Sequence, residues 1–335
     1  TSLGMFMGGQ SVMKEVRKDI DRLGDYADAS AEQVQEARET RDEIETRMEQ
    51  VRARFDILAA SRIDDEIDTE PVSDTDVDVT DHESFERAQE VLKTTDPIHF
   101  PAAFPEVFDG DNSGFDVIVG NPPWEKAKME EHIFWARYEP GLQRGITQGE
   151  REKRIQELRN ERPDLVEEYK KEKREQEIRS KLLTKGPYPG IGGGDPDMYL
   201  AFSWRFWNLT QDSGRVGVVL PRGAFGNASS EEFRKQLLKN GNVDDITFIK
   251  NKSQWAFDGV GGRYTIGLLC FQRGIFKENR TVPLRGPFTG EESFEEGVSS
   301  DPYKFSVEVA QNWTKTATHP SLPMEILLPE RTTMS

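Results

Sequence analysis

The feature that most constrains the fold of this 335-residue chain is a short apolar run that ends in a stiff polar turn. Residues 115–120, Phe-Asp-Val-Ile-Val-Gly, are rich in β-branched side chains and are bounded by turn-forming residues, which is typical of a parallel strand buried on both faces. Asn121-Pro122-Pro123-Trp124 follows directly. Because ligands of open α/β sheets bind beyond the carboxyl ends of such strands, this tetrapeptide is the first candidate for a functional site.

The two prolines give the tetrapeptide a defined shape, since proline fixes its own φ and keeps the residue before it extended. The Asn121 amide, the Pro122 carbonyl and the Trp124 ring are therefore expected at the strand tip. Two oxygen acceptors and one aromatic ring suit a flat heterocycle that carries an exocyclic amino group. Such a site works by positioning and electrostatics, without a catalytic His or Cys. A base within a duplex would reach it only by flipping out.

Alternating strand and helix patterns in the second half predict an α/β sheet. Asp195 is expected as N-cap and Pro196 as the first residue of a helix whose aromatic side chains belong to the core. Ser229 and Glu232 form a capping-box pattern before another helix. The expected segments are helix 198–209 (with Trp204, Phe206 and Trp207), strand 215–220, helix 231–239, strand 243–250 and strand 264–271.

The rest of the chain suggests four divisions. Residues 1–62 read as a helical hairpin or coiled-coil arm, with a capping-box start at Ser30 and Gln33, and residues 63–83 as an acidic linker unable to fold alone. Residues 84–285 form the catalytic part, with a charged helical insertion at 148–182 that is interrupted at Pro163. Residues 286–335 read as a polar tail or the start of a further domain, without a clear element.

The net charge of -17 is unevenly distributed. Residues 1–110 hold 12 basic and 28 acidic side chains, whereas residues 185–285 hold 14 basic and 9 acidic ones, so a basic face for nucleic acid remains compatible with the total. The acidic excess favours a halophilic source, with a single acidic linker as the alternative. Arg222, Lys250, Lys252 and Arg263 are candidates for phosphate contacts, or plain solvated surface.

Several classes are excluded by composition. One cysteine and four scattered histidines predict neither a disulfide framework nor a metal site, and leave little for hydrolase chemistry. No apolar run is long enough to span a membrane and no secretion signal opens the chain, so we expect a cytoplasmic protein.

Residues 115–124 resemble the catalytic motif of the S-adenosylmethionine-dependent DNA methyltransferases that modify the N6 amino group of adenine. The resemblance is narrower to the large single-chain enzymes of restriction-modification and phage-defence systems. It runs from about Phe100 to Arg273, and its further elements are Phe104-Pro-Glu-Val-Phe, the charged insertion, Gly194-Asp-Pro-Asp-Met-Tyr and Ser213-Gly-Arg-Val-Gly-Val-Val-Leu-Pro. It implies a partial Rossmann-like methyltransferase sheet preceded by a helical arm, with double-stranded DNA bearing a flipped adenine as the partner.

Carried over residue by residue, the resemblance assigns the target amino group to Asn121 and Pro122 within the Asn121–Trp124 motif. It places Trp124 against one face of the base. Phe257 matches the aromatic residue that packs the opposite face. Asp197 and Tyr199 would lie near the boundary between cofactor and substrate.

One departure is that residues 1–114 contain no Asp-Pro-x-x-Gly-x-Gly cofactor loop. We therefore expect a piece of a longer polypeptide, or one that works with a restriction or defence partner. The alternative is a catalytically incomplete DNA-binding or scaffold fragment. A glutamine methyltransferase fits less well because of the long insertion, and a coiled-coil interaction protein would rest on residues 30–60 alone. Pro163-Asp164 with Glu168 and Lys170 only faintly resembles a nuclease pattern, since its spacing is too short.

Overall fold

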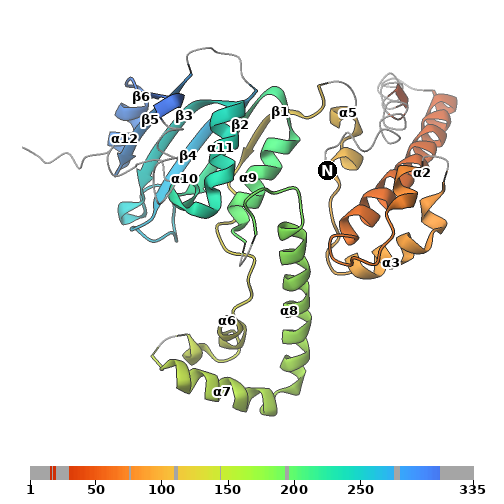
Figure 1. Cartoon of the computed structure of the whole chain (residues 1–335), viewed down its shortest axis with the longest axis horizontal. Coiled ribbons are helices and arrows are strands. Elements are labelled where there is room, and N and C mark those ends of the chain that lie inside the picture. The colour runs from red at the N-terminus through yellow and green to blue at the C-terminus, as the bar shows by residue number, and fades with distance from the viewer. Residues whose placement is uncertain are drawn as a thin grey trace, which may run out of the picture.

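The computed structural model describes residues 16, 18–19, 30–74, 77–108, 112–143, 145–192, 196–274 and 280–309. Three parts are distinct in Figure 1: N-terminal helices, a sheet covered by helices, and a helical lobe that hangs from the sheet. The lobe is inserted between the first and second strands, so the chain leaves the sheet and returns to it.

The sheet has six strands in the order β1-β2-β4-β3-β5-β6. Strands β1, β2, β3 and β5 run in one direction, because β1 pairs with β2 and β3 with β5 in parallel, while β4 and β6 run the opposite way. This mixed sheet confirms the expected α/β, Rossmann-like fold preceded by helices. The strands are β1 (Phe115–Gly120), β2 (Thr210–Pro221), β3 (Gly241–Lys250), β4 (Thr265–Arg273), β5 (Thr281–Phe288) and β6 (Tyr303–Ser306).

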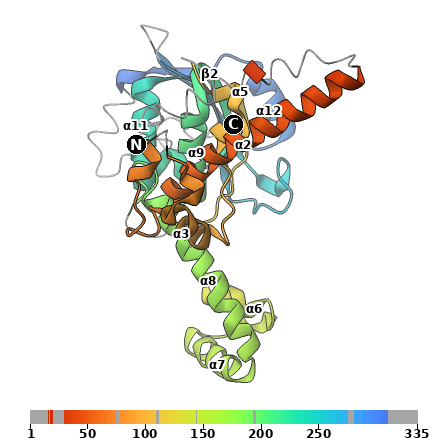
Figure 2. The same cartoon turned by 90° about the vertical axis from the view of Figure 1, so that its right-hand side faces the viewer.

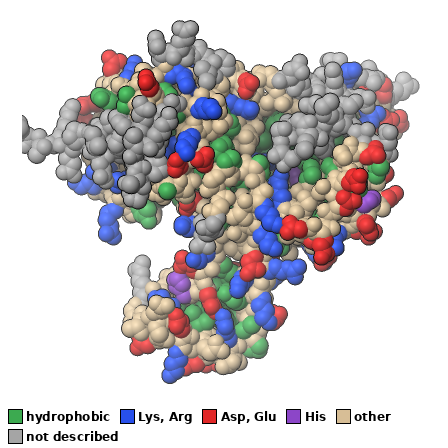
Figure 3. Space-filling model, viewed as in Figure 1, with side chains coloured by type: hydrophobic (Ala, Val, Ile, Leu, Met, Phe, Trp, Pro, Cys, Tyr) green, Lys and Arg blue, Asp and Glu red, His purple; other side chains and the backbone are tan. Residues whose placement is uncertain are grey.

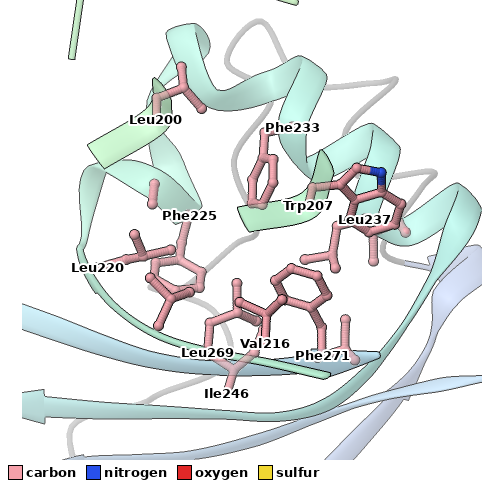
Figure 4. Close-up of a cluster of buried hydrophobic side chains, with 14 of the residues drawn as sticks. Leu200, Trp207, Val216, Leu220, Phe225, Phe233, Leu237, Ile246, Leu269 and Phe271 are labelled. Atoms are coloured by element: carbon pink, nitrogen blue, oxygen red, sulfur yellow. The ribbon is translucent and has the colours of Figure 1, made fainter. Parts of the chain in front are cut away.

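Three helices pack on one face of this sheet and close the main core (Figures 1 and 4). Side chains alternate along a strand, so the inward residues of β2 are Val216, Val218 and Leu220, all buried. The predicted core positions Trp204 and Trp207 are buried as well, and Phe206 packs against the same cluster. The helices are α9 (Met198–Leu209), α10 (Gly223–Gly226) and α11 (Glu231–Asn240).

The expectation that β1 is buried on both faces is wrong. Ile118 packs against the main core, but Val117 and Val119 on the opposite face are 61% and 82% exposed. The reason is that no described element covers Val117 and Val119 on this face; the rings of Phe104 and Phe108 contact Phe115 at the start of the strand, and the outward Cys270 of the inner strand β4 is exposed as well. Apolar composition alone could not show that this face has no covering layer.

The inserted lobe stands away from the rest of the molecule (Figure 2) and has its own hydrophobic core. It begins earlier than the sequence predicts, but the predicted interruption at Pro163 does separate its two long helices. Its second helix starts at a capping box formed by Thr147 and Glu150. The elements are α6 (Glu131–Ala136), η4 (Pro140–Leu142), α7 (Gln148–Glu161) and α8 (Pro163–Thr184).

The N-terminal part is built on one long helix, α2 (Ala31–Ala60), that packs against α3 (Glu83–Leu92). Residues between them do not form an unfolded linker. They contain η2 (Glu70–Ser73) and η3 (Val79–Asp81), and Val79 is fully buried in the core between α2 and α3. The few apolar side chains there suffice because they join an existing core. Two short helices, α4 (Phe100–Ala103) and α5 (Pro105–Phe108), lead to β1. The first half of the expected hairpin, before residue 30, lies outside the described residues apart from positions 16, 18 and 19, and so does the Gln33 side chain.

Three local expectations are also corrected. Residues 286–309 are structured, since β5 pairs with β3 and is followed by α12 (Glu291–Val298) and β6. Backbone pairing across the sheet outweighed the Pro and Gly content that favoured a loop. The N-cap of α9 is Asp197, whereas Asp195 lies outside the described residues. Helix α11 is capped by Ser230 without a side-chain bond, so the capping box did not form. Within the described ranges, no helix is both long and apolar enough to cross a membrane.

Candidate functional site

The tetrapeptide Asn121–Trp124 leaves the carboxyl end of β1, as predicted. The last residue of the strand, Gly120, pairs with Val218 of β2 and lies directly under the Phe206 ring of α9. A Cβ atom at position 120 would stand only 2.8 Å from Cζ of Phe206, so only glycine fits there without a shift. The contact with α9 thereby fixes the position of Gly120, the last strand residue, and of Asn121 after it.

The four residues differ in exposure. Asn121 and Pro123 are exposed, Pro122 is buried, and Trp124 is half-buried against the main core. The Asn121 amide makes no hydrogen bond to another described residue, and the buried Trp124 Nε1 likewise finds no described partner. The stiff turn therefore displays one amide whose oxygen and nitrogen are both available to a ligand.

Backbone hydrogen bonds hold the segment after the tetrapeptide against the start of α9. The amide of Ala127 donates to the Pro196 carbonyl at 2.8 Å, and the amide of Met198 donates to the Glu125 carbonyl at 3.0 Å. Lys126 and Asp197 form an isolated antiparallel bridge between the same segments. The structure thus brings Asn121–Trp124 and Asp197 into one neighbourhood, although they are far apart in sequence.

Asp197 and Tyr199 each contact a serine directly before α11, and among the described residues Oδ1 of Asp197 has no hydrogen-bond partner. The Ser229 hydroxyl donates to Oδ2 of Asp197 at 3.3 Å, and the Tyr199 hydroxyl is 3.3 Å from Oγ of Ser230. Burial raises the pKa of Tyr199, so its hydroxyl stays protonated. Both side chains are bound to residues that precede or begin α11.

Phe257 lies beyond the carboxyl end of β3, in the loop of residues 251–262. Since β1, β2 and β3 run in the same direction, their carboxyl ends share one edge of the sheet. Three strand spacings, about 14 Å, separate β1 from β3 across β2 and β4. The Phe257 loop and Asn121–Trp124 therefore flank the same edge, but no contact between Phe257 and the tetrapeptide is formed.

A hollow separates the sheet-bearing part from the inserted lobe in Figure 3, and Lys and Arg side chains lie along its upper rim. The chain enters the lobe from Asn121–Trp124, so the candidate site lies where these two parts join. Lys250, Lys252 and Arg263, which flank the Phe257 loop, are exposed. The charge at this edge is thus of the sign that phosphate groups require.

Sequence reasoning missed Asn251, the buried residue at which β3 passes into the Phe257 loop. Its side chain makes four hydrogen bonds within the loop. The sequence around it, Ile249-Lys-Asn-Lys-Ser, reads as an exposed polar turn. Only its place directly after a strand could have drawn attention to it.

Comparison with known proteins identifies one family. Residues 33–157, a little more than a third of the chain, match the model of a family described as Eco57I restriction-modification methylase. The matched range includes β1 and Asn121–Trp124 but not Phe257. None of the curated proteins compared with the chain matches it.

Two solved structures show weak likeness. One comes from work on complex assembly and conformational transition of the type I R-M system, with 14% identity, a TM-score of 0.33 and coverage of 59% of this chain and 36% of that chain. The other is a modification subunit assigned to a type I restriction enzyme from Vibrio vulnificus YJ016, with 15% identity, a TM-score of 0.36 and coverage of 68% of this chain and 42% of that chain. The chain therefore spans less than half the length of both solved chains.

Proposed function

We propose that this chain carries the target-base half of a restriction-modification or phage-defence methyltransferase, which transfers a methyl group from S-adenosylmethionine to the N6 amino group of adenine in DNA. The observation that carries the proposal is the exposed Asn121 amide, without a partner among the described residues, on a clamped Pro-Pro turn at the carboxyl end of a parallel strand. The family match over residues 33–157 supports the same activity.

The roles follow from the chemistry of an exocyclic amino group. The side-chain oxygen of Asn121 and the carbonyl of Pro122 accept its two hydrogens, which leaves the nitrogen lone pair directed away from both acceptors. Trp124 supplies an aromatic surface beside the turn, and Phe257 supplies one from the β3 side. Stacking on aromatic side chains offsets the cost of extracting the adenine from its duplex.

The methyl donor is proposed from this chemistry and from the family match. The Tyr199 hydroxyl is buried beside Ser230, whereas Asp197 keeps an acceptor oxygen, Oδ1, that no described residue binds. Asp197 is therefore the member of the expected pair with an unused acceptor. We assign no residue of this chain to the donor.

The alternative proposal is a catalytically incomplete DNA-binding or scaffold piece. The lack of an Asp-Pro-x-x-Gly-x-Gly loop in residues 1–114 favours it, since a chain without that loop can still hold a base. Both proposals use Asn121–Trp124 and Phe257, and they differ in whether methyl transfer follows.

The test is to incubate the chain with mixed-sequence DNA and radiolabelled S-adenosylmethionine in high salt, beside Asn121→Ala. Asn121 is exposed and bonded to no described residue, so this variant should keep its fold. If this chain also binds the donor, label will appear on N6 of adenine and fall at least a hundredfold in the variant, the size of effect seen when a positioned polar group is removed. Label that persists in Asn121→Ala would refute the assigned role.

If no label appears, a binding measurement decides whether the chain binds the target base without methyl transfer or does not bind it at all. The probe is a fluorescein-labelled duplex with an adenine opposite an abasic site, and binding is followed by fluorescence anisotropy. Binding that depends on Asn121 would establish the alternative. Neither label nor binding would refute both proposals.

A further inference from the structure

We propose that Asn251 is a positioning residue that holds the loop of residues 251–262 in the one shape that presents Phe257 at the target-base edge of the sheet. This inference rests on the proposed function, because it gives Asn251 a role through Phe257. The two parts, loop holding and base binding, are tested separately below.

The hydrogen bonds of Asn251 use its full capacity. Nδ2 donates to the carbonyls of Phe257 at 2.8 Å and Val260 at 2.9 Å, while Oδ1 accepts from the amides of Ala256 and Phe257, each at 3.1 Å. An asparagine amide offers two donor hydrogens and one acceptor oxygen with two lone pairs. Every one of these is directed to the loop, and two of the four bonds are to Phe257 itself.

Burial makes these bonds hard to replace with water. Asn251 is 0% exposed, although it stands where the chain leaves the sheet. Its own amide donates to the Tyr264 carbonyl at 3.2 Å, which ties it to the residue that precedes β4. The loop therefore closes around a side chain that is itself fixed to both flanking strands. If the loop moved away, the buried Asn251 amide and its loop partners would be left without hydrogen bonds. The side chain and the loop therefore stabilise each other.

The backbone of the loop would not keep this shape unaided. Ser253 and Gln254 have φ values of 57° and 59°, in the left-handed region that non-glycine residues rarely occupy. Two such residues in succession persist only where surrounding contacts hold them. Two further side-chain hydrogen bonds support the loop: Trp255 Nε1 donates to the Lys250 carbonyl at 2.9 Å, and the Gly259 amide donates to Gln254 Oε1 at 3.3 Å.

Asn251 differs from a merely structural buried asparagine, and the same strand provides one for comparison. Asn242 is 3% exposed at the opposite end of β3, where its Nδ2 donates to the Gly274 carbonyl at 3.1 Å. It has the same side chain, comparable burial and the same strand, but it contacts no residue of the Phe257 loop. Asn242→Ala is therefore the matched control for loss of a buried amide.

The first arm of the experiment measures loop holding without DNA. Hydrogen exchange by mass spectrometry is followed in peptides that cover residues 251–262 and β4 for the wild type and for Asn251→Ala, Asn251→Asp and Asn242→Ala. We expect exchange of the Ala256 and Phe257 amides to accelerate at least tenfold in Asn251→Ala, while exchange in β4 stays unchanged. In Asn242→Ala, exchange in residues 251–262 should equal that of the wild type. Asn251→Asp keeps the size but sets a buried carboxylate against the carbonyls of Phe257 and Val260, so it should accelerate exchange at least as much. Unchanged loop exchange in both Asn251 variants would overturn the proposal.

The second arm measures binding of the fluorescein-labelled duplex with an adenine opposite an abasic site. We expect Phe257→Ala and Asn251→Ala each to weaken binding about tenfold, the effect of losing one stacking contact. The double variant should bind no more weakly than Phe257→Ala alone, because Asn251 acts through Phe257. Additive losses of about a hundredfold, or normal binding by Asn251→Ala beside weakened Phe257→Ala, would overturn the positioning role. If Phe257→Ala binds normally, the proposed base site is wrong, and the first arm still decides whether Asn251 holds the loop.

Discussion

The two faces of the sheet beside β1 should respond very differently to the same small truncation. Val218 of β2 is 3% exposed and points into the main core, whereas Val119 of β1 is 82% exposed on the opposite face. Valine to alanine removes the equivalent of two methylene groups. Burial of each is worth about 0.8 kcal/mol, and the cavity left behind adds to the loss. We therefore expect Val218→Ala to cost about 2–3 kcal/mol, and Val119→Ala less than about 0.5 kcal/mol.

Native-state hydrogen exchange of the β4 peptide measures both losses, because β4 pairs along β2 and opens only when the sheet opens. A loss of 2–3 kcal/mol corresponds to exchange about 30- to 150-fold faster, while Val119→Ala should change exchange less than about threefold. A neutral Val218→Ala would refute the described core. A cost above about 1 kcal/mol for Val119→Ala would show that another segment or a second copy covers this face in solution.

Three further predictions concern the strand end, the lobe and the sheet face. Gly120→Ala should lower the free energy of unfolding by about 1–3 kcal/mol through overpacking against the Phe206 ring, and Gly120→Ala/Phe206→Leu should recover part of that stability. Thermal melting measures both variants, and no recovery in the double variant would contradict the contact. Phe134→Ala should destabilise the lobe by about 3–5 kcal/mol and expose residues 130–185 to proteolysis, while the sheet stays protected from hydrogen exchange. If the sheet also lost its protection, lobe and sheet would unfold together. Cys270 is exposed, but partial desolvation on the sheet face, followed by the charge of Asp245, raises the pKa of its thiol, so its thiolate fraction at neutral pH is lower than that of a free cysteine. The rate of alkylation should therefore reach half its maximum above the ordinary midpoint of about pH 8.5, and a midpoint at or below that value would contradict this environment.

Much of the candidate site could be predicted from sequence because its determinants are local. The Pro-Pro turn is rigid wherever it occurs, and its position after an apolar run identifies the end of a strand. The aromatic helix at Met198–Leu209 was predicted for a similar reason, since aromatic spacing is a short-range signal, but its N-cap was placed two residues too early, at Asp195.

Features that depend on distant partners could not be predicted in this way. Val79 is buried because α2 and α3 close around it, although its own segment is strongly acidic. Strand β5 forms despite Pro283, Gly286 and Pro287 because β3 offers it an edge to pair with. In both cases the stabilising groups come from elements far away in the chain, and they outweigh local propensity.

By itself, the sequence determined the α/β class, the strand that ends at Gly120 and the stiff turn that carries Asn121, since each depends on residues adjacent in the chain. The three-dimensional arrangement set which side chains are exposed and which are enclosed. It left Val117 and Val119 on a face that no described element covers there, placed Asp197 and Tyr199 beside Ser229 and Ser230, and enclosed Asn251 within the Phe257 loop. The physical reason is that exposure and hydrogen-bond partners are properties of neighbours in space, which a linear pattern of residues does not contain.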